Sequence, residues 1–328
     1  MPTRRGFLRS SALAGMALPY ISTNALAQTD QYPTGPIRSI CPLAVGSGAD
    51  ARVRFLMNKL SQMTGKPGIV ENKPGALGNI ATEYVARSKP DGYTIYVTPG
   101  SSTLASAPAL FKKLNYDPLN DFEHITTLSS SAFVLCVTGD SPFQTVRDLT
   151  NYLKDKGDAA SYGSIAPPGL VSSEIYKTQF GLKTVEVKYR DTGGLFNDLF
   201  SGQLAFTHID MTTIAGQLKS GKLRALHVTS AKRLAAAPHI PGAEEAGVPN
   251  MDVVTWWSVH VPAKTPASIC EKLEAWFNTM VREPDVIKFH TDVGGDMMPG
   301  NSKSLRELLI KQTALWKEYV RIAKIEPE

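Results

Sequence analysis

The sequence of 328 residues has few cysteines, no long apolar run and no strong charge of one sign. The apolar run at residues 12–21 is far shorter than the roughly 20 residues that a membrane-spanning helix needs, and no later stretch qualifies. The formal net charge of +5 falls to +2 without Arg4, Arg5 and Arg9. So small a charge gives no reason to expect nucleic acid or a membrane surface as a partner.

Cysteine is too scarce to build a disulfide framework. The three cysteines, Cys41, Cys136 and Cys270, are far apart in the sequence, so at most one disulfide can form. The alternative is that all three are buried as small apolar side chains. We favour burial, although the sequence leaves the disulfide state open.

The patterns that carry metal binding or catalysis are also missing. The six histidines form no His-Glu-x-x-His and no pair four residues apart, and His208 and Asp210 have no visible third ligand. No glycine-rich stretch matches a dinucleotide or phosphate-loop motif, so we expect no metal and no cofactor. Ser47 lies in Gly-Ser-Gly without the full Gly-x-Ser-x-Gly spacing of a serine hydrolase. We therefore expect a protein that is not an enzyme, with a hydrolase using Ser47 as an alternative.

The first 27 residues are typical of an export signal. Residues 3–9, Thr-Arg-Arg-Gly-Phe-Leu-Arg, form a twin-arginine motif, an apolar run follows, and residues 25–27, Ala-Leu-Ala, are a small-residue cleavage site. We exclude residues 1–27 from the fold and expect the rest of the chain in the periplasm.

Two glycine-containing stretches organise the part that follows: the first corner, residues 41–50, and the second corner, residues 71–79. Each comes after a short apolar strand and before residues with helical spacing, with Asn79 as the expected cap of the second helix. Glycine lets the backbone approach a ligand closely, and the first N–H groups of a helix have no partner inside it. Two helix N-termini at one sheet edge are therefore predicted to hold a carboxylate or phosphate.

Strands and helices alternate along the chain, which predicts an α/β fold with two doubly wound lobes. The chain is expected to cross between the lobes near residues 130 and 252, which is a hinge architecture. Lobe 1 would contain residues 28–130 and 253–328, and lobe 2 residues 131–252. The predicted strands are 37–41, 68–71, 94–98, 133–138, 160–164, 186–189, 204–209, 225–229 and 256–261, and the long C-terminal helices are 267–282 and 303–325.

Further candidate ligand contacts follow other predicted strands. Arg190 is the cation best placed for a second anionic group, because a guanidinium can bind a carboxylate through two parallel bonds. A surface arginine paired with Asp191 is the alternative. Trp256 and Trp257 are neighbours in a predicted strand, so one ring should fill the core while the other faces the ligand.

Several motifs in order along the chain resemble the Bug-type substrate-binding proteins of tripartite tricarboxylate transporters. The similarity covers almost the whole chain after the export signal. The motifs are Gly-Ser-Gly-Ala-Asp-Ala-Arg at 46–52, Glu-Asn-Lys-Pro-Gly-Ala at 71–76, Val-Ala-Arg at 85–87, Pro-Asp-Gly-Tyr-Thr at 90–94, Tyr-Asp-Pro at 116–118, Tyr-Gly-Ser at 162–164, Gly-Lys-Leu-Arg-Ala-Leu at 221–226 and Glu-Ala-Gly at 245–247.

The resemblance implies a type II periplasmic binding protein-like fold and a monomer that captures a small organic carboxylate and delivers it to membrane permease subunits. It also implies that the two corners hold one carboxylate. A sensory binder that signals to a membrane receptor is a second alternative. The sequence does not tell whether the ligand is aliphatic or aromatic, or whether it has one carboxylate or two. The predicted ligand contacts are Leu43, Val45, Ser47, Gly48, Ala49, Asp50, Ala76, Gly78, Asn79, Ser101, Ser102, Ser164, Arg190, Thr192, Gly193, His208, Asp210 and Trp257.

The sequence departs from the family pattern mainly in lobe 2. Lys-Tyr-Arg-Asp at 188–191 stands where the family usually has Pro-Tyr-Lys-Gly, and Pro-Pro-Gly-Leu at 167–170 stands where a His-Leu is expected. Ala205 stands where an aspartate is common. The resemblance therefore transfers the corner contacts more directly than the contacts of lobe 2.

Overall fold

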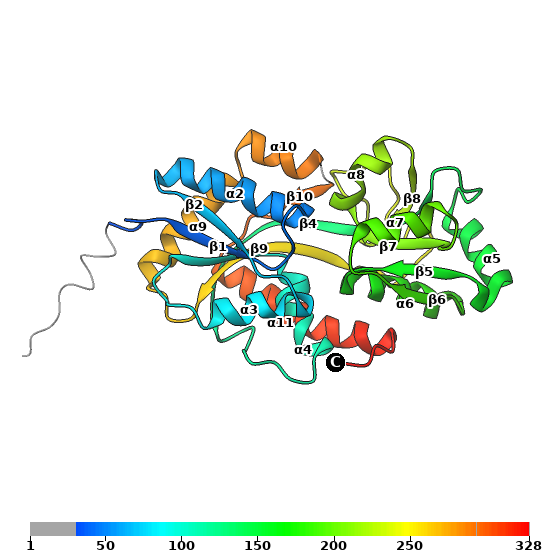
Figure 1. Cartoon of the computed structure of the whole chain (residues 1–328), viewed down its shortest axis with the longest axis horizontal. Coiled ribbons are helices and arrows are strands. Elements are labelled where there is room, and N and C mark those ends of the chain that lie inside the picture. Colours follow the sequence, from blue (N-terminus) through cyan, green and yellow to red (C-terminus); the bar gives the residue numbers. More distant parts are fainter. Residues whose placement is uncertain (1–30, 293, 328) are drawn as a thin grey trace, which may run out of the picture. The chain divides into compact units, whose positions relative to one another are not determined.

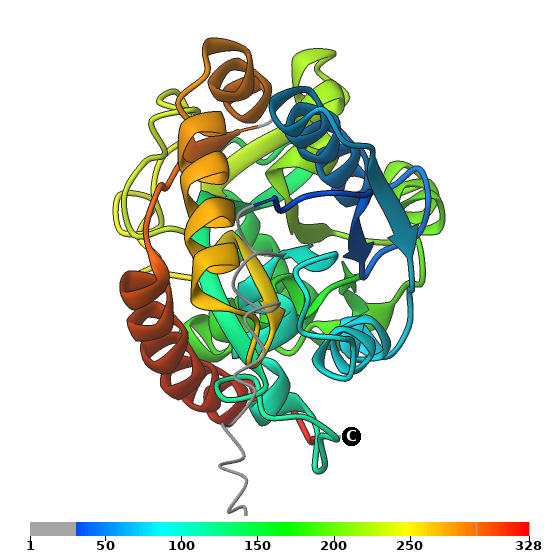
Figure 2. The same ribbon diagram turned by 90° about the vertical axis from the view of Figure 1, so that its left-hand side faces the viewer.

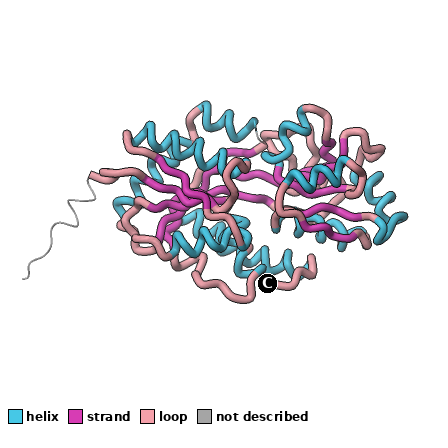
Figure 3. The backbone as a smooth tube through the Cα atoms, in the orientation of Figure 1, coloured by secondary structure: helices cyan, strands magenta, loops and turns pink. Residues whose placement is uncertain are grey.

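A connected sheet forms the centre of the computed structural model, which describes residues 31–292 and 294–327; the predicted export signal lies outside them. In this described part the strands follow the order β2-β1-β3-β9-β4-β7-β5-β6, and β8 and β10 also pair with β4. Figures 1 and 3 show the strands between helices on both sides. The strands are β1 (Ile37–Cys41), β2 (Gly68–Asn72), β3 (Thr94–Thr98), β4 (Phe122–Thr138), β5 (Ser161–Ser164), β6 (Val185–Lys188), β7 (Phe206–Asp210), β8 (Leu223–Val228), β9 (Val254–Pro262) and β10 (Gly295–Met297).

The sheet is mixed, with parallel strands at both ends of the order and antiparallel strands between them. Strand β1 pairs in parallel with β2 and β3, and β5 pairs in parallel with β6 and β7. The long strands β4 and β9 pair antiparallel to each other, and β9 is also antiparallel to β3. The two groups of parallel strands were predicted, and so were parts of β4 and β9, at 133–138 and 256–261. The antiparallel pairing by which β4 and β9 join the two groups into one sheet was not predicted.

The predicted crossings near residues 130 and 252 lie at or beside two neighbouring strands. Ser131 of β4 stands opposite Thr255 of β9 in the antiparallel register. Their hydroxyl groups are 2.9 Å apart, and the Thr255 hydroxyl also donates to the Ser131 carbonyl at 3.0 Å. The assignment of residues to two lobes stays a prediction.

Helices cover the sheet on both sides, as Figure 2 also shows for α2 (blue) and α11 (red). They are α2 (Gly48–Thr64), α3 (Asn79–Ala86), α4 (Ala107–Leu110), α5 (Val146–Lys156), α6 (Pro167–Phe180), α7 (Thr192–Phe200), α8 (Met211–Lys219), α9 (Ala267–Met280), α10 (Pro284–Asp292) and α11 (Ser302–Ile322), with short turns η1 (Ala76–Gly78), η2 (Ser101–Ala105) and η3 (Gly157–Ala159). In the described part of the chain, no helix is both long and apolar enough to cross a membrane.

Local sequence signals explain where two of these helices begin and end. Helix α2 buries Val53 and Leu56, and it ends at Gly65, whose φ of 66° is the left-handed conformation that glycine adopts readily. Helix α5 begins with a capping box, in which Thr145 accepts a bond from the backbone N–H of Asp148 and the Asp148 side chain bonds back.

The core draws on strands from both ends of the sheet. One buried cluster combines Ile40 and Trp256 with Tyr162 and Phe206. The cysteines are free; Cys41 and Cys136 are buried and Cys270 is half-buried. The expected apolar burial of cysteine is therefore confirmed for two of the three positions.

Candidate ligand-binding site

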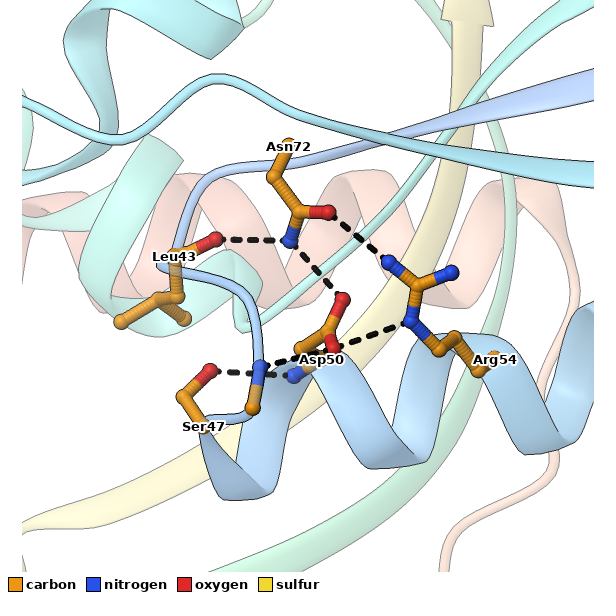
Figure 4. A network of polar contacts seen from close by, with 6 residues as sticks. Leu43, Ser47, Asp50, Arg54 and Asn72 are labelled. Carbon is orange, nitrogen blue, oxygen red and sulfur yellow. Dashed lines mark hydrogen bonds and ion pairs between the residues drawn. The ribbon is translucent and has the colours of Figure 1, made fainter.

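The carboxylate of Asp50 fixes the conformation of the first corner (Figure 4). It accepts hydrogen bonds from the backbone N–H of Gly46 at 3.0 Å, from Nε of Arg54 at 2.9 Å and from Nδ2 of Asn72 at 2.8 Å. Asn72 comes from the end of β2, and its Nδ2 also donates to the carbonyl of Leu43 at 2.9 Å. The network therefore ties the exposed loop before α2 to the helix and to the neighbouring strand.

Asp50 stays ionised in spite of its burial. It is 3% exposed. Burial alone would raise the pKa of Asp50, but the hydrogen bonds from Arg54, Gly46 and Asn72 outweigh it and lower the pKa below the usual value. Ser47 is the N-cap of α2, and its hydroxyl accepts the backbone N–H of Asp50 at 3.2 Å. A helix-capping role thus accounts for Ser47 without a hydrolase.

The second corner has an unusual run of left-handed backbone. Gly75, Ala76, Leu77 and Gly78 all have positive φ, at 129°, 47°, 52° and 95°. Such values are costly for residues with a side chain, and strained backbone of this kind is found preferentially at ligand sites. Leu77 is 44% exposed, so burial of its side chain in the core does not offset the cost of the strained backbone.

Close packing around Gly78 brings three predicted ligand loops together. A Cβ added to Gly78 would lie 2.8 Å from Cγ2 of Thr103 and 3.4 Å from Cβ of Pro42. Pro42 belongs to the first corner, and Thr103 belongs to η2. The structure therefore places the two corners and the segment with Ser101 and Ser102 side by side.

The predicted cap at Asn79 is wrong. The N-cap of α3 is Gly78, which makes no side-chain bond, and Asn79 is the first residue of the helix. The Asn79 Oδ1 instead accepts a hydrogen bond from the hydroxyl of Tyr116 at 2.5 Å. This partner comes from a distant part of the sequence, so the local pattern could not reveal it.

Residues 101–105, which include the predicted contacts Ser101 and Ser102, form a turn of π-helix. Ser101 is buried, and its hydroxyl accepts the backbone N–H of Trp256 at 3.3 Å. Ser102 is half-buried. Trp256 lies in the core, whereas the ring of Trp257 packs against the guanidinium of Arg52, with Cζ 4.7 Å from the ring centroid. Both rings are buried, in different surroundings, and a ligand contact of Trp257 stays a prediction.

The predicted contacts after β5 and β6 differ in their exposure. Ser164 is buried, and its hydroxyl donates to Glu186 at 2.5 Å. Thr192 and the exposed Gly193 begin helix α7, which Asp191 caps by accepting the N–H of Gly194 at 2.9 Å.

Arg190 is exposed and forms no ion pair with any residue that the structure describes. Arg190 thus lies on the surface, as the alternative expected, but the expected pairing with Asp191 is not formed.

His208 and Asp210 lie at the end of β7 in different environments. His208 is 2% exposed, its Nδ1 is 2.9 Å from the hydroxyl of Ser173, and burial lowers its pKa well below the usual value. Asp210 is half-buried and caps α8, where it accepts the N–H of Thr212 at 2.9 Å. Asp210 is therefore at the edge where ligands were expected, and the His208 ring points into the packing around α6.

Two features near the first corner escaped prediction. A Cβ added to Gly48 would lie 3.6 Å from Oγ1 of Thr212, so the N-termini of α2 and α8 approach each other. Arg52, on the second turn of α2, is only 2% exposed. An arginine in a helix is ordinarily exposed, and no local signal showed that this side chain is buried.

Comparison with known families shows whether the chain is a binding protein or a hydrolase. A family model described as the tripartite tricarboxylate transporter family receptor matches residues 52–325. The chain belongs to this receptor family. Its members are substrate-binding proteins of the periplasmic type and not enzymes, which confirms the resemblance found in the sequence.

The similarity to known proteins extends over nearly the whole of this chain. A UPF0065 protein of Bordetella bronchiseptica is 30% identical over 324 residues, which cover 98% of this chain and 95% of the relative. The structure of R. palustris Rpa4515 with adipate has a TM-score of 0.84 at 28% identity and covers 90% of this chain and all of that one.

Two further structures support the same fold. The periplasmic binding protein BugD has a TM-score of 0.81 at 27% identity, with 90% of this chain and 100% of BugD covered. MatC from Rhodopseudomonas palustris with bound malate has a TM-score of 0.78 at 25% identity, with 88% and 100% covered. The predicted α/β binding-protein fold is confirmed.

Proposed function

We propose that this receptor captures a small organic carboxylate in the periplasm and delivers it to a membrane permease of the tripartite tricarboxylate type. The observation that supports the carboxylate most directly is the first corner, in which buried Asp50 fixes exposed backbone at the N-terminus of α2. Oriented N–H groups and the helix dipole favour an anion there. Relatives with adipate and malate bind ligands of this class.

We further propose that binding closes two lobes, residues 28–130 with 253–328 and residues 131–252, about the neighbouring positions Ser131 and Thr255. A ligand that contacts both lobes stabilises the closed state only by its greater affinity for that state. The approach of Gly48 to Thr212 supports this mechanism, because these residues belong to different proposed lobes.

A thermal-shift screen tests the ligand class. The chain without its first 27 residues is heated with mono-, di-, tri- and aromatic carboxylates, and a tight ligand raises the melting temperature by mass action. We expect at least one carboxylate to raise it, while the matched alcohols and amides do not. If amides or sugars stabilise the protein and no carboxylate does, the proposed ligand class is wrong.

Delivery to a permease needs a test in cells. Deleting the gene should abolish uptake of the acid found in the screen, and restoring the gene with its export signal should recover it. Normal uptake in the deletion strain, with loss of a transcriptional response to the acid, would favour the sensory alternative.

A further inference from the structure

Arg52 is a buried cation that forms no ion pair with any residue that the structure describes. Its side chain is 2% exposed, and Nη1 and Nη2 are both buried without a hydrogen bond to any described residue. Burial lowers the pKa of Arg52 to about 10, although the charge of Asp210 acts in the opposite direction. A guanidinium is therefore held, charged at neutral pH, in a place where its donors are unsatisfied. Such an arrangement is unfavourable unless something else binds those donors.

The ring contact of Arg52 does not involve its N–H groups. The indole ring of Trp257 packs against the guanidinium, with Cζ 4.7 Å from the ring centroid. Stacking on an aromatic ring uses the flat face of a guanidinium and leaves its N–H groups free in the plane. His290 lies close enough that the charge of Arg52, after burial, helps to lower the pKa of His290 to about 4. His290 is thus neutral at physiological pH and does not compete as a second cation.

The position of Arg52 on α2 directs it towards the predicted carboxylate site. Side chains in a helix lean towards its N-terminus, over the residue four positions earlier. For Arg52 that residue is Gly48, which has no side chain to obstruct the guanidinium. Gly48 lies beside Thr212, two residues after Asp210, and the charge of Asp210 acts on Arg52. Because Asp210 caps α8 and its charge acts on Arg52, the side of α2 that carries Arg52 faces α8.

We propose that Arg52 binds a second carboxylate of the ligand, so that the preferred ligand is a small dicarboxylate. The corner N–H groups hold one carboxylate, and the guanidinium holds the other through two parallel hydrogen bonds. This inference rests on the proposed function, and it adds a side chain that selects among carboxylates. Compared with the exposed Arg190, a buried guanidinium attracts an anion more strongly because water screens it less.

Pairs of acids with the same number of carbons test the inference by isothermal titration. Succinate is compared with butyrate, and adipate with hexanoate, on the wild-type chain, on R52M and on the control R147M, which alters an exposed arginine of α5. We expect the wild type and R147M to prefer the dicarboxylate of each pair. R52M should bind the dicarboxylates about 10- to 100-fold more weakly, which is the usual effect of losing hydrogen bonds to a charged group. Its affinity for the monocarboxylates should stay within about threefold of the wild type.

Two results would overturn the inference. One is a dicarboxylate affinity of folded R52M within about threefold of the wild type, and the other is an equal loss for both members of a pair, which would indicate a structural role. If R52M does not fold, the same selectivity ratio is measured on R52K, whose single ammonium cannot form two parallel bonds and should reduce the ratio. If the wild type binds no organic acid at all, the proposed function itself fails.

Discussion

Asp50 is the residue on which the candidate site depends most. Its carboxylate accepts from a loop N–H, a helix side chain and a strand side chain, Gly46, Arg54 and Asn72. A ligand carboxylate held by backbone groups requires those groups to be in place before it arrives, because ordering them on binding costs affinity. The buried carboxylate of Asp50 thus orders the loop that is proposed to bind the ligand carboxylate, and Asp50 itself does not contact the ligand.

The variant D50N should weaken both the fold of the corner and ligand binding. An amide has the same size, but it has no charge and replaces one acceptor oxygen with a donor. We expect the free energy of unfolding to fall by about 1–3 kcal/mol and ligand affinity to fall about tenfold, which corresponds to about 1.4 kcal/mol. Titration with the best ligand of the screen and thermal melting measure the two effects. The control D155N, on the exposed surface of α5, should change neither. Unchanged affinity together with a lowered melting temperature would restrict Asp50 to a structural role.

The residues of the site could be predicted only where their signals are local. Ser47 and Asp50 lie three residues apart at a helix start, a spacing that already indicates capping. Asn72 reaches the same carboxylate from another strand, and Arg52 is buried by Trp257 and by α10, more than 200 positions along the chain. These contacts exist because the sheet brings distant segments together, and periodicity carries no information about them.

Two glycines within helices allow a test of packing at the level of an element. Gly169 of α6 is buried against β7, and a Cβ there would lie 2.4 Å from the carbonyl oxygen of His208. Gly216 of α8 is exposed, and a Cβ there would meet nothing within 4 Å. The same substitution should therefore have opposite effects at the two positions.

We expect G169A to destabilise the protein by about 1–3 kcal/mol through overpacking. G216A should stabilise it by about 0.5–1 kcal/mol, because alanine favours a helix and restricts the unfolded chain. Chemical denaturation measures both changes. An unchanged free energy of unfolding in G169A would mean that α6 can move away from β7 at little energetic cost.

Apolar strands were easier to predict than the polar first half of β4. Strands β1 and β3 match their predicted bounds because their apolar runs end at turn residues. Residues 122–132 of β4 are rich in hydroxyl side chains, which suggest an exposed loop, yet most of them are buried. Thr126, for example, donates to the carbonyl of Gly300 at 3.0 Å, from a segment far along the chain. Distant hydrogen-bond partners thus make a polar strand compatible with the core.

At the scale of the whole molecule, β4 and β9 turn two groups of parallel strands into one sheet. The alternation of strands and helices predicted the two groups of parallel strands. Their antiparallel pairing depends on the register Ser131 with Thr255, which two segments 124 residues apart adopt only in the folded chain. This pairing gives a physical reason to expect that any lobe movement bends two adjacent strands and not two independent linkers.

Burial of histidines throughout the molecule should make its stability depend on pH. His124, His208, His227, His260 and His290 are all buried, and burial is the largest cause that lowers the pKa of each, to about 4 for His124, His227 and His290. A lowered folded-state pKa means that the unfolded chain binds more protons between about pH 4 and 6.5. Stability should therefore be complete above about pH 6.5 and decrease as the pH falls towards about 4.

Each histidine with a pKa near 4 contributes at most about 3 kcal/mol of this loss, since one pKa unit corresponds to about 1.36 kcal/mol. Melting temperatures between pH 7.5 and 4.5 measure the effect, and H227L should show a shallower decrease because it removes one buried titrating ring. H239Q alters an exposed histidine and should follow the wild type. A melting temperature that stays constant down to pH 4.5 would show that the buried rings bind protons as readily in the folded chain as in the unfolded one.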